Sequence, residues 1–295
     1  MSIQLIQQAI CYMEEHLYED ISYAEVAKSV HMSCYNFHRT FSFIAGMTAN
    51  EYIRKRRLTL AAKELQTTDI SVIDAAYKYG YESPESFSRA FSRFHGSTPS
   101  QAKRKGARFH LFNPLVIKII LEGGSIMDYR IEHRESQQFV AMVKAFPNEI
   151  VNDDNDHSIP DFWAECSRGN LIDPMKKLRA EGKKDLYGLC GPVKGSETSF
   201  NYGIGVIVDE NTDTSGLEDF LAKGYSLWKT EPADYAVFKC FGSDGNCLGE
   251  AWDRFFKEFV PQTGYMQTDD TDYEIYFEKG ESGLFCELWV PVKQV

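Results

Sequence analysis

Apolar residues in the first hundred positions recur with the spacing of α-helices. Two segments, residues 33–46 and 83–96, each place three large apolar side chains on one stripe at about 100° per residue. These side chains are Phe37, Phe41 and Ile44 in the first segment and Phe87, Phe91 and Phe94 in the second. Each segment begins with a serine suited to cap a helix and ends at a glycine suited to stop one. The pattern predicts two amphipathic helices of about three turns, each with its stripe in a core.

The two segments are copies of one unit at an offset of 50 residues. Seven identities support the repeat: Ser33/Ser83, Phe37/Phe87, Arg39/Arg89, Phe41/Phe91, Ser42/Ser92, Gly46/Gly96 and Thr48/Thr98. A shorter apolar pattern precedes each copy, at residues 23–27 and 72–76, with Ser22 and Ser71 as candidate caps. A short helix, a turn and a capped second helix make a helix-turn-helix unit. Residues 51–66 are rich in helix formers and predict a rigid connecting helix.

The outer faces of the two second helices carry the candidate chemistry. The outer side of the first helix presents Tyr35 and Arg39 with His38 at the flank, and that of the second presents Glu85 and Arg89 with Ser88 at the flank. Arginine can donate to guanine O6 and N7, and two helices fixed about 34 Å apart can read successive major grooves. The predicted phosphate contacts, which position without reading sequence, are Ser33, Arg54, Arg56, Ser83 and Lys103. The expected partner is double-stranded DNA.

The charge of the chain is divided unequally. The net charge of -11 argues by itself against nucleic acid, because phosphate binding needs clustered Lys and Arg. Residues 1–108, however, carry 14 Lys and Arg against 11 Asp and Glu, and the remaining chain carries 18 against 32. DNA binding is therefore expected of residues 1–108 and a different function of the acidic remainder.

From residue 127 onward the pattern changes to short alternating runs typical of strands. The runs lie at residues 129–132, 139–146, 202–208, 225–229, 235–241, 273–277 and 285–290, interrupted by helical windows near 160–168 and 247–259. Residues 141–146 resemble residues 236–241, which suggests duplicated strand-helix-strand-strand halves. We therefore predict a multidomain chain: an all-α domain at 1–108 with two helix-turn-helix units, a linker at 109–126, and an α+β domain at 127–295.

Residues 33–46, 52–58 and 73–99 resemble the AraC/XylS family of transcription regulators. The match is densest in the run Gly80-Tyr81-Glu82-Ser83-Pro84-Glu85-Ser86-Phe87-Ser88-Arg89-Ala90-Phe91 and in Gly96-Ser97-Thr98-Pro99. The resemblance implies a sequence-specific regulator that reads bases with the two second helices. The base-reading residues that it implies are Tyr35, His38, Arg39, Glu85, Ser88 and Arg89. It also implies RNA polymerase as a partner, and we expect an activator.

The second part resembles GyrI-like effector-binding domains of the Rob/BmrR type. Residues 127–132, the pair Phe162-Trp163, residues 187–189, Trp228 and residues 287–292 carry this likeness. It implies a small-molecule effector, held in an aromatic groove where Glu287 contacts a cationic lipophilic ligand. A carboxylate beside aromatic faces attracts a weakly hydrated cation, which agrees with that role. The candidate aromatic residues are Trp163, Tyr187, Tyr202, Trp228 and Trp289, although each is also a common core residue.

The sequence contains no nucleophile elbow, phosphate-binding loop, dinucleotide fingerprint or zinc-protease motif. We therefore expect no enzyme. The alternative is a hydrolase or sequestering module for a toxic small molecule, in which Glu287 and either Tyr187 or Tyr202 would supply base and acid.

The seven cysteines are scattered, contain no CxxC pair and indicate a reducing compartment. Cys34 and His38 lie four residues apart, as a metal pair could, but no further ligand stands at a finger spacing. We expect neither a metal nor a cofactor. No apolar run reaches the length of a membrane span, so a cytoplasmic protein without membrane contact is expected.

Overall fold

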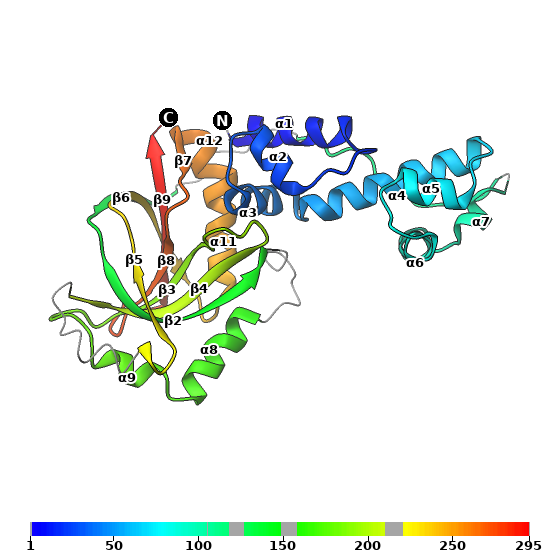
Figure 1. Ribbon diagram of the computed structural model, residues 1–295. Coiled ribbons are helices and arrows are strands. Elements are labelled where there is room, and N and C mark those ends of the chain that lie inside the picture. The colour runs from blue at the N-terminus through cyan, green and yellow to red at the C-terminus, as the bar shows by residue number, and fades with distance from the viewer. Residues whose placement is uncertain (1, 105, 118–126, 149–157, 210–220, 295) are drawn as a thin grey trace. The chain divides into compact units, whose positions relative to one another are not determined.

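The computed structural model describes residues 2–104, 106–117, 127–148, 158–209 and 221–294. They belong to two compact units, Ile3–Ile120 and Leu121–Val295, each considered by itself (Figure 1). The first unit is helical and the second is built on an antiparallel sheet. The expected combination of an all-α part and an α+β part is confirmed.

The first unit contains two helix-turn-helix units joined by a long helix. Its helices are α1 (Ser2–Glu15), α2 (Tyr23–Ser29), α3 (Cys34–Ala45), α4 (Ala49–Thr67), α5 (Val72–Lys78), α6 (Pro84–His95) and α7 (Pro99–Ala102). The side chains of Ser22, Ser33, Ser71 and Ser83 accept the capping hydrogen bonds that their positions predicted. Gly46 and Gly96 end α3 and α6 in the left-handed conformation, where glycine lacks the steric penalty of other residues. Helix α1 was not foreseen.

Two hydrophobic cores lie along α4. The first gathers α1, α2 and α3 around Phe37 and Phe41, and the second gathers α5, α6 and α7 around Phe87 and Phe91. Ile53 of α4 belongs to the first core, and further residues of α4 belong to the second. Phe37, Phe41, Phe87 and Phe91 of the two predicted stripes are buried, and Ile44 and Phe94 are half-buried against the same cores. Helix α4 joins the cores as one continuous helix.

Residues 107–117 follow α7 and pack on the same helical unit. The amide of Phe112 donates to Thr59 Oγ1 at 3.0 Å, and Gln66 Nε2 donates to the carbonyl of Ala107 at 3.1 Å. Leu115 and Ile117 pack against the first core. Partial burial of these two side chains contributes, with the hydrogen bonds, to holding the segment there.

The second unit contains a nine-stranded antiparallel sheet among its described residues. Its elements are β1 (Arg130–Arg134), β2 (Gln138–Pro147), α8 (Ser158–Arg168), α9 (Ile172–Lys176), β3 (Leu186–Pro192), β4 (Ser199–Val208), β5 (Tyr225–Lys229), β6 (Ala233–Phe241), α11 (Asn246–Arg254), the π-helical turn η2 (Phe255–Phe259), α12 (Val260–Thr263), β7 (Tyr265–Gln267), β8 (Asp272–Tyr276) and β9 (Leu284–Gln294). The strand order is β1-β6-β9-β8-β3-β4-β2-β5, and β7 pairs with β9. Strands β3 and β8 therefore lie at the centre.

The helices cover one face of this sheet. Phe162 of α8 packs on Phe146 of β2, and Phe255 and Phe259 of η2 pack on Phe238 of β6. Residues opposite each other in the ladder share a face, and neighbours along a strand alternate between faces. The register therefore assigns every strand residue either to the helix-covered face or to the opposite face, which carries a second aromatic core.

Burial of His95 in the second helical core predicts a pH-dependent stability. Its Nε2 donates to the carbonyl of Leu58 at 3.0 Å, and its ring lies 4.2 Å from that of Phe91. Burial lowers the pKa of His95 from the ordinary histidine value, so the folded state keeps the ring neutral. The neutral ring contributes its full share of stability above about pH 6.5, which is its pKa in the unfolded state. This contribution is lost as the pH falls through the lowered pKa of the folded state.

We expect helix unfolding, followed by far-ultraviolet circular dichroism in urea, to require less urea at pH 5 than at pH 7.5. His95→Gln should reduce this difference, because glutamine carries no titrating group. An equal pH dependence in both proteins would contradict the assignment.

Candidate DNA interface and candidate effector site

Helix α6 exposes the predicted reading face of the second helix-turn-helix unit. Pro84 occupies the first helical turn, and Ser83 caps the helix by accepting from Ser86 N at 3.2 Å. The side chains of Glu85 and Arg89 are exposed, and that of Ser88 is half-buried. An exposed arginine on a capped helix is the group that can reach a base edge in the major groove.

The predicted reading residues of α3 contact one another and helix α2. The Arg39 guanidinium folds back over the ring of Tyr35, one turn earlier, and donates to its hydroxyl. The ring of His38 meets that of Tyr23 in α2 edge to face at 5.8 Å. A helical wheel does not reveal these contacts.

Four of the residues predicted to contact phosphates are either exposed or at the N-terminus of a helix. Arg54 is exposed on α4. Lys103 is exposed after α7, and its ammonium donates to the carbonyl of Ile70 at 2.7 Å. Ser33 and Ser83 are the N-caps of α3 and α6. A capping serine stands at the positive end of a helix dipole, a position that favours a phosphate.

Arg56 is the exception, because it does not lie at the surface as expected. It is 6% exposed, and its Nε and Nη2 donate to the carboxylate of Glu14 in α1 at 2.7 and 2.8 Å. Its Nη1 donates to the carbonyl of Phe112 at 2.6 Å. Burial alone would raise the pKa of Glu14, but hydrogen bonds from Arg56 and Tyr52 outweigh it and lower that pKa. Arg56 therefore ties α1 and residues 107–117 to α4.

A carboxylate stands at the centre of the helix-covered face of the sheet. Glu274 lies on β8 opposite Gly188 of β3. Its Oε2 accepts hydrogen bonds from the hydroxyls of Tyr202 and Tyr276, each at 2.8 Å. Trp163 of α8 donates to the Tyr202 hydroxyl at 2.9 Å, and its ring lies 5.0 Å from that of Tyr276. We call these four residues, Trp163, Tyr202, Glu274 and Tyr276, the Glu274 cluster.

The Glu274 cluster combines a fixed charge with reachable rings. Tyr202 is buried, whereas Trp163, Glu274 and Tyr276 are half-buried and so retain contact with solvent. Burial, and then the nearby Glu274 carboxylate, raises the pKa of both tyrosines well above the ordinary phenol value. Both hydroxyls thus stay protonated and keep donating to Glu274. This arrangement can accept a flat or aromatic cation.

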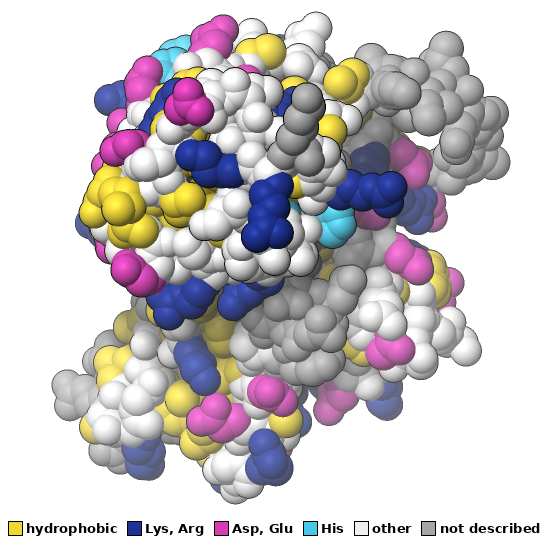
Figure 2. All heavy atoms as spheres, turned by 90° about the vertical axis from the view of Figure 1, so that its right-hand side faces the viewer, with side chains coloured by type: hydrophobic (Ala, Val, Ile, Leu, Met, Phe, Trp, Pro, Cys, Tyr) yellow, Lys and Arg dark blue, Asp and Glu magenta, His cyan; other side chains and the backbone are white. Residues whose placement is uncertain are grey.

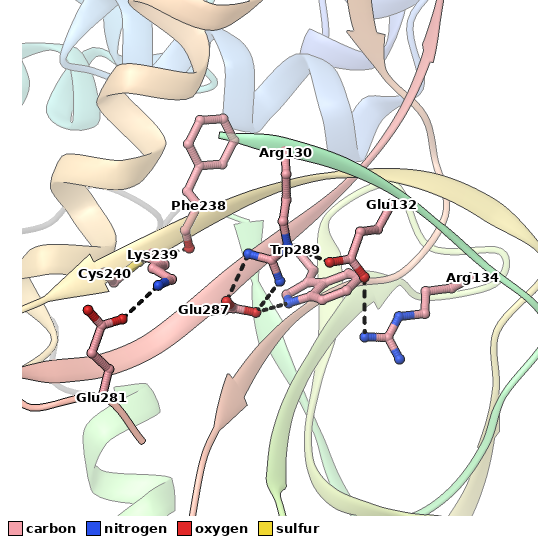
Figure 3. Close-up of polar contacts among 9 residues, drawn as sticks. All are labelled: Arg130, Glu132, Arg134, Phe238, Lys239, Cys240, Glu281, Glu287 and Trp289. Carbon is pink, nitrogen blue, oxygen red and sulfur yellow. Dashed lines mark hydrogen bonds and ion pairs between the residues drawn. The ribbon is translucent and has the colours of Figure 1, made fainter. Parts of the chain in front are cut away.

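The opposite face carries Glu287, which is already paired. Figure 3 shows the Arg130 guanidinium donating to both Glu287 oxygens, at 2.8 and 2.7 Å, and the Trp289 indole donating to Oε2 at 3.1 Å. Arg130 also pairs with Glu132, and the Arg134 guanidinium lies 4.1 Å above the ring of Trp289. Donation to the Glu287 carboxylate raises the pKa of Arg130. Arginine side chains of the protein itself therefore pair with the Glu287 carboxylate and stack on the Trp289 indole.

Comparisons with known proteins match both units. A model described as a helix-turn-helix domain matches residues 26–105, and one described as an integron-associated effector binding protein matches residues 130–292, more than half of the chain. The chain belongs to this effector-binding family and carries an AraC-type helix-turn-helix domain. The sequence resemblance is thereby confirmed, as is the broader assignment to DNA-binding transcription regulators.

Relatives of the AraC-type domain are regulators themselves. The regulatory protein SoxS of Salmonella typhimurium is 39% identical over 102 residues, covering 35% of this chain and 95% of SoxS. The transcriptional activator AarP of Providencia stuartii is 38% identical over 96 residues, covering 32% of this chain and 71% of AarP. The solved structure of SAV2435 bound to tetraphenylphosphonium is 18% identical, covers 57% of this chain and 94% of that one, and has a TM-score of 0.46.

The effector-binding domain separates the predicted ligand residues onto its two faces. Trp163 and Tyr202 lie in the Glu274 cluster, whereas Tyr187, Trp228, Glu287 and Trp289 lie on the opposite face. Trp228 covers Gly191 and Gly203 there and donates to Thr271 at 2.9 Å. Burial raises the pKa of Tyr187 to about 12. The acid-base pair of Glu287 with Tyr202 does not form, because these side chains lie on different faces.

Sequence reasoning missed Glu274 and Tyr276. The available signal was the strand pattern at residues 273–277, which places both side chains on one face. Within the described ranges, no group of three or more His, Cys, Asp and Glu is arranged to hold a metal ion. None of the described helices combines the length and apolarity needed to cross a membrane.

Proposed function

We propose that this chain is a sequence-specific transcription activator whose effector-binding domain takes up a small aromatic cation at the Glu274 cluster. The observation that carries the proposal is a carboxylate held by two tyrosine hydroxyls at the centre of the sheet, beside half-buried rings of Trp163 and Tyr276. Activation, rather than repression, is supported by the description of AarP as an activator.

The choice of Glu274 over Glu287 follows from charge. A cation that approached Glu287 would have to displace Arg130, which makes two hydrogen bonds to the same carboxylate. At Glu274 the hydroxyls of Tyr202 and Tyr276 donate, and these phenols orient the carboxylate without bringing a charge of their own. Aromatic faces add attraction for a cation, worth about 2 kcal/mol where water is excluded. The Glu274 cluster therefore supports cation binding better.

Calorimetric titration with tetraphenylphosphonium and with tetraphenylborate, an anion of similar shape, tests this site. We expect the cation to bind the wild-type protein and Glu274→Gln to weaken it at least about tenfold, or 1.4 kcal/mol. Glu287→Gln is the matched control and should leave the affinity for the cation unchanged. If the Glu274→Gln variant still binds tetraphenylphosphonium and the Glu287→Gln variant does not, Glu287 is the carboxylate that binds the cation. Binding of the borate alone would contradict a cation site.

The DNA-reading role is tested at Arg89. A duplex selected by the protein from a random pool supplies the operator, and fluorescence anisotropy then compares that operator with a scrambled duplex. Arg89→Ala should weaken specific binding by about 1 to 3 kcal/mol and affect the scrambled duplex little, because a base contact is lost. Arg54→Ala, the control on the same domain, should weaken both duplexes and reduce the salt slope by about one. Equal losses on both duplexes in Arg89→Ala would contradict base reading.

A further inference from the structure

The Arg57 side chain of α4 binds the chain segment that follows α1. Its Nε donates to the carbonyl of Leu17 at 2.8 Å, and its Nη2 donates to the carbonyl of Glu19 at 2.6 Å. Leu17 is 1% exposed and belongs to the first helical core. The guanidinium is thereby attached to the backbone beside that core.

The same guanidinium packs against Gly80, in the turn between α5 and α6. A Cβ atom at Gly80 would lie 2.5 Å from Arg57 Nη1 and 3.1 Å from Arg57 Cζ. No side chain fits there while Arg57 keeps its position. One guanidinium therefore contacts both halves of the helical domain.

The first copy of the repeat shows that this turn also accepts a side chain. Aligning Ser22 with Ser71 places His31 opposite Gly80. Both residues are left-handed, with φ of 55° and 77°, and each amide donates to the carbonyl three residues earlier at 3.1 Å. Histidine is among the residues that tolerate this conformation, and His31 is exposed. The need for glycine at position 80 therefore comes from Arg57 as well as from the backbone.

Aromatic and charged contacts join the same two segments. The rings of Tyr18 and Tyr79 lie 5.6 Å apart. The Lys78 ammonium lies 5.4 Å from the Tyr18 ring centre and 2.6 Å from the Glu64 carboxylate of α4. The Tyr79 hydroxyl also donates to Glu64, at 2.8 Å. We use the name Arg57 brace for Arg57 together with residues 17–19 and residues 78–80.

Arg57 is placed to hold protein rather than phosphate. It is half-buried, and its Nε and Nη2 both donate to main-chain carbonyls. Figure 2 looks onto the side of the molecule where α5, α6 and α7 lie in Figure 1, and it shows Lys and Arg side chains at the surface, where phosphates can reach them. Arg54, on the same helix as Arg57, is exposed and remains a phosphate candidate.

We propose that Arg57 is a positioning residue for DNA recognition: it fixes the rotation of α3 relative to α6 and so restricts the protein to one spacing between the two halves of its operator. This proposal rests on the proposed function as a sequence-specific DNA-binding protein. A helix by itself can bend along its length. The Arg57 brace prevents such bending in α4, because it joins the segments that α4 connects.

Operator spacing is the property that the Arg57 brace controls. One inserted base pair moves two DNA segments apart by about 3.4 Å and rotates them by about a tenth of a turn. A braced protein cannot follow this change, whereas a protein without the brace can follow part of it. The brace therefore excludes sites that have the right bases at the wrong separation.

The test compares the selected operator with duplexes that carry one base pair more or one fewer between the two contacted segments, which hydroxyl-radical footprinting locates. Fluorescence anisotropy measures the affinities, and their ratio is the spacing penalty. We expect a penalty of at least about tenfold for the wild type and a penalty at least about threefold smaller for Arg57→Lys. Lysine keeps the charge but cannot reproduce the fixed pair of guanidinium donors.

Gly80→Ala changes the Arg57 brace from its other end. The new Cβ must displace the flexible end of Arg57, so the spacing penalty should fall as it does in Arg57→Lys. Gly96→Ala is the matched control, because Gly96 is also left-handed, with φ of 71°, yet no atom lies within 4 Å of its Cβ position. It carries the same backbone strain and should keep the wild-type penalty. All variants are compared at a temperature where circular dichroism shows them folded.

Two results on DNA would overturn the proposal. One is an unchanged spacing penalty in both Arg57→Lys and Gly80→Ala. The other is a salt slope that falls by about one in Arg57→Gln, which would make Arg57 a phosphate contact.

A measurement without DNA separates the Arg57 brace from the proposed function. If the protein selects no duplex from the random pool, sequence-specific binding is refuted. Double electron-electron resonance then tests the brace, with spin labels on a keto-bearing amino acid that replaces the exposed Lys28 of α2 and Arg93 of α6, which avoids the native cysteines. We expect one narrow distance distribution in the otherwise wild-type chain and a broader one with Arg57→Lys. Equal widths would refute the brace.

Discussion

Replacing Arg130 with methionine should lower the free energy of unfolding of the effector-binding domain by about 3 kcal/mol, the low end for breaking a buried ion pair. The Glu287 side chain is 7% exposed, and its carboxylate would lose both of its arginine hydrogen bonds. The low end applies because the Arg130 side chain is 38% exposed, so water partly compensates. All four tryptophans lie in this domain, so intrinsic tryptophan fluorescence in urea reports its unfolding within the intact chain.

The matched control is the double variant Arg130→Met/Glu287→Leu. Replacing both partners with apolar residues removes the unpaired charge and should restore most of the lost stability. Arg134→Met removes a guanidinium that stacks on Trp289 but whose ion pair with Glu132 is 3.8 Å long, and it should cost much less. If the single Arg130→Met variant had the wild-type free energy of unfolding, the ion pair would contribute no stability.

Gly188→Ala should abolish tight binding of tetraphenylphosphonium at the Glu274 cluster. A Cβ atom at this position would collide with the Tyr202 hydroxyl and with Glu274 Oε2. The collision must separate the two groups, so the affinity should fall at least about tenfold. Overpacking of this kind also costs about 1 to 3 kcal/mol of stability. Calorimetry under conditions where the variant is fully folded measures the affinity.

The control for this substitution is Gly245→Ala. No atom lies within 4 Å of the Cβ position at Gly245, so both stability and affinity should be unchanged. Unaltered cation binding by Gly188→Ala would place the ligand away from the Glu274 cluster. Loss of folding without any change in the affinity of the folded fraction would assign Gly188 to packing alone.

The helical part of the fold could be predicted because its signals are local. A serine cap, a glycine stop and a stripe of phenylalanines all lie within one helix, and the repeat doubles the evidence. The strands were predicted for the same reason, from alternation over a few residues. The exceptions are informative: β3 (Leu186–Pro192) contains two glycines and a proline and gave no clear alternation.

The site could not be predicted in the same way, because its partners are distant in sequence. Arg130 meets Glu287 across 157 positions, and Tyr202 meets Glu274 across 72. The strand register and the face that the helices cover determine which carboxylate meets an arginine. Short sequence patterns predict neither of them. Arg56 shows the same limit, since its partner Glu14 belongs to a helix, α1, that the pattern did not reveal.

The connecting helix α4 has a consequence for the DNA itself. Its 19 residues form a rod of about 28 Å, and a rod sets both the separation and the rotation of the two helices that it joins. The two copies carry different side chains, so we expect the DNA sequence read by the protein to be asymmetric. A symmetric dimer, by contrast, reads a palindrome. Inverting such a sequence in front of a gene would turn the protein end for end. Operator orientation, and not only operator position, should therefore determine which genes this chain can control.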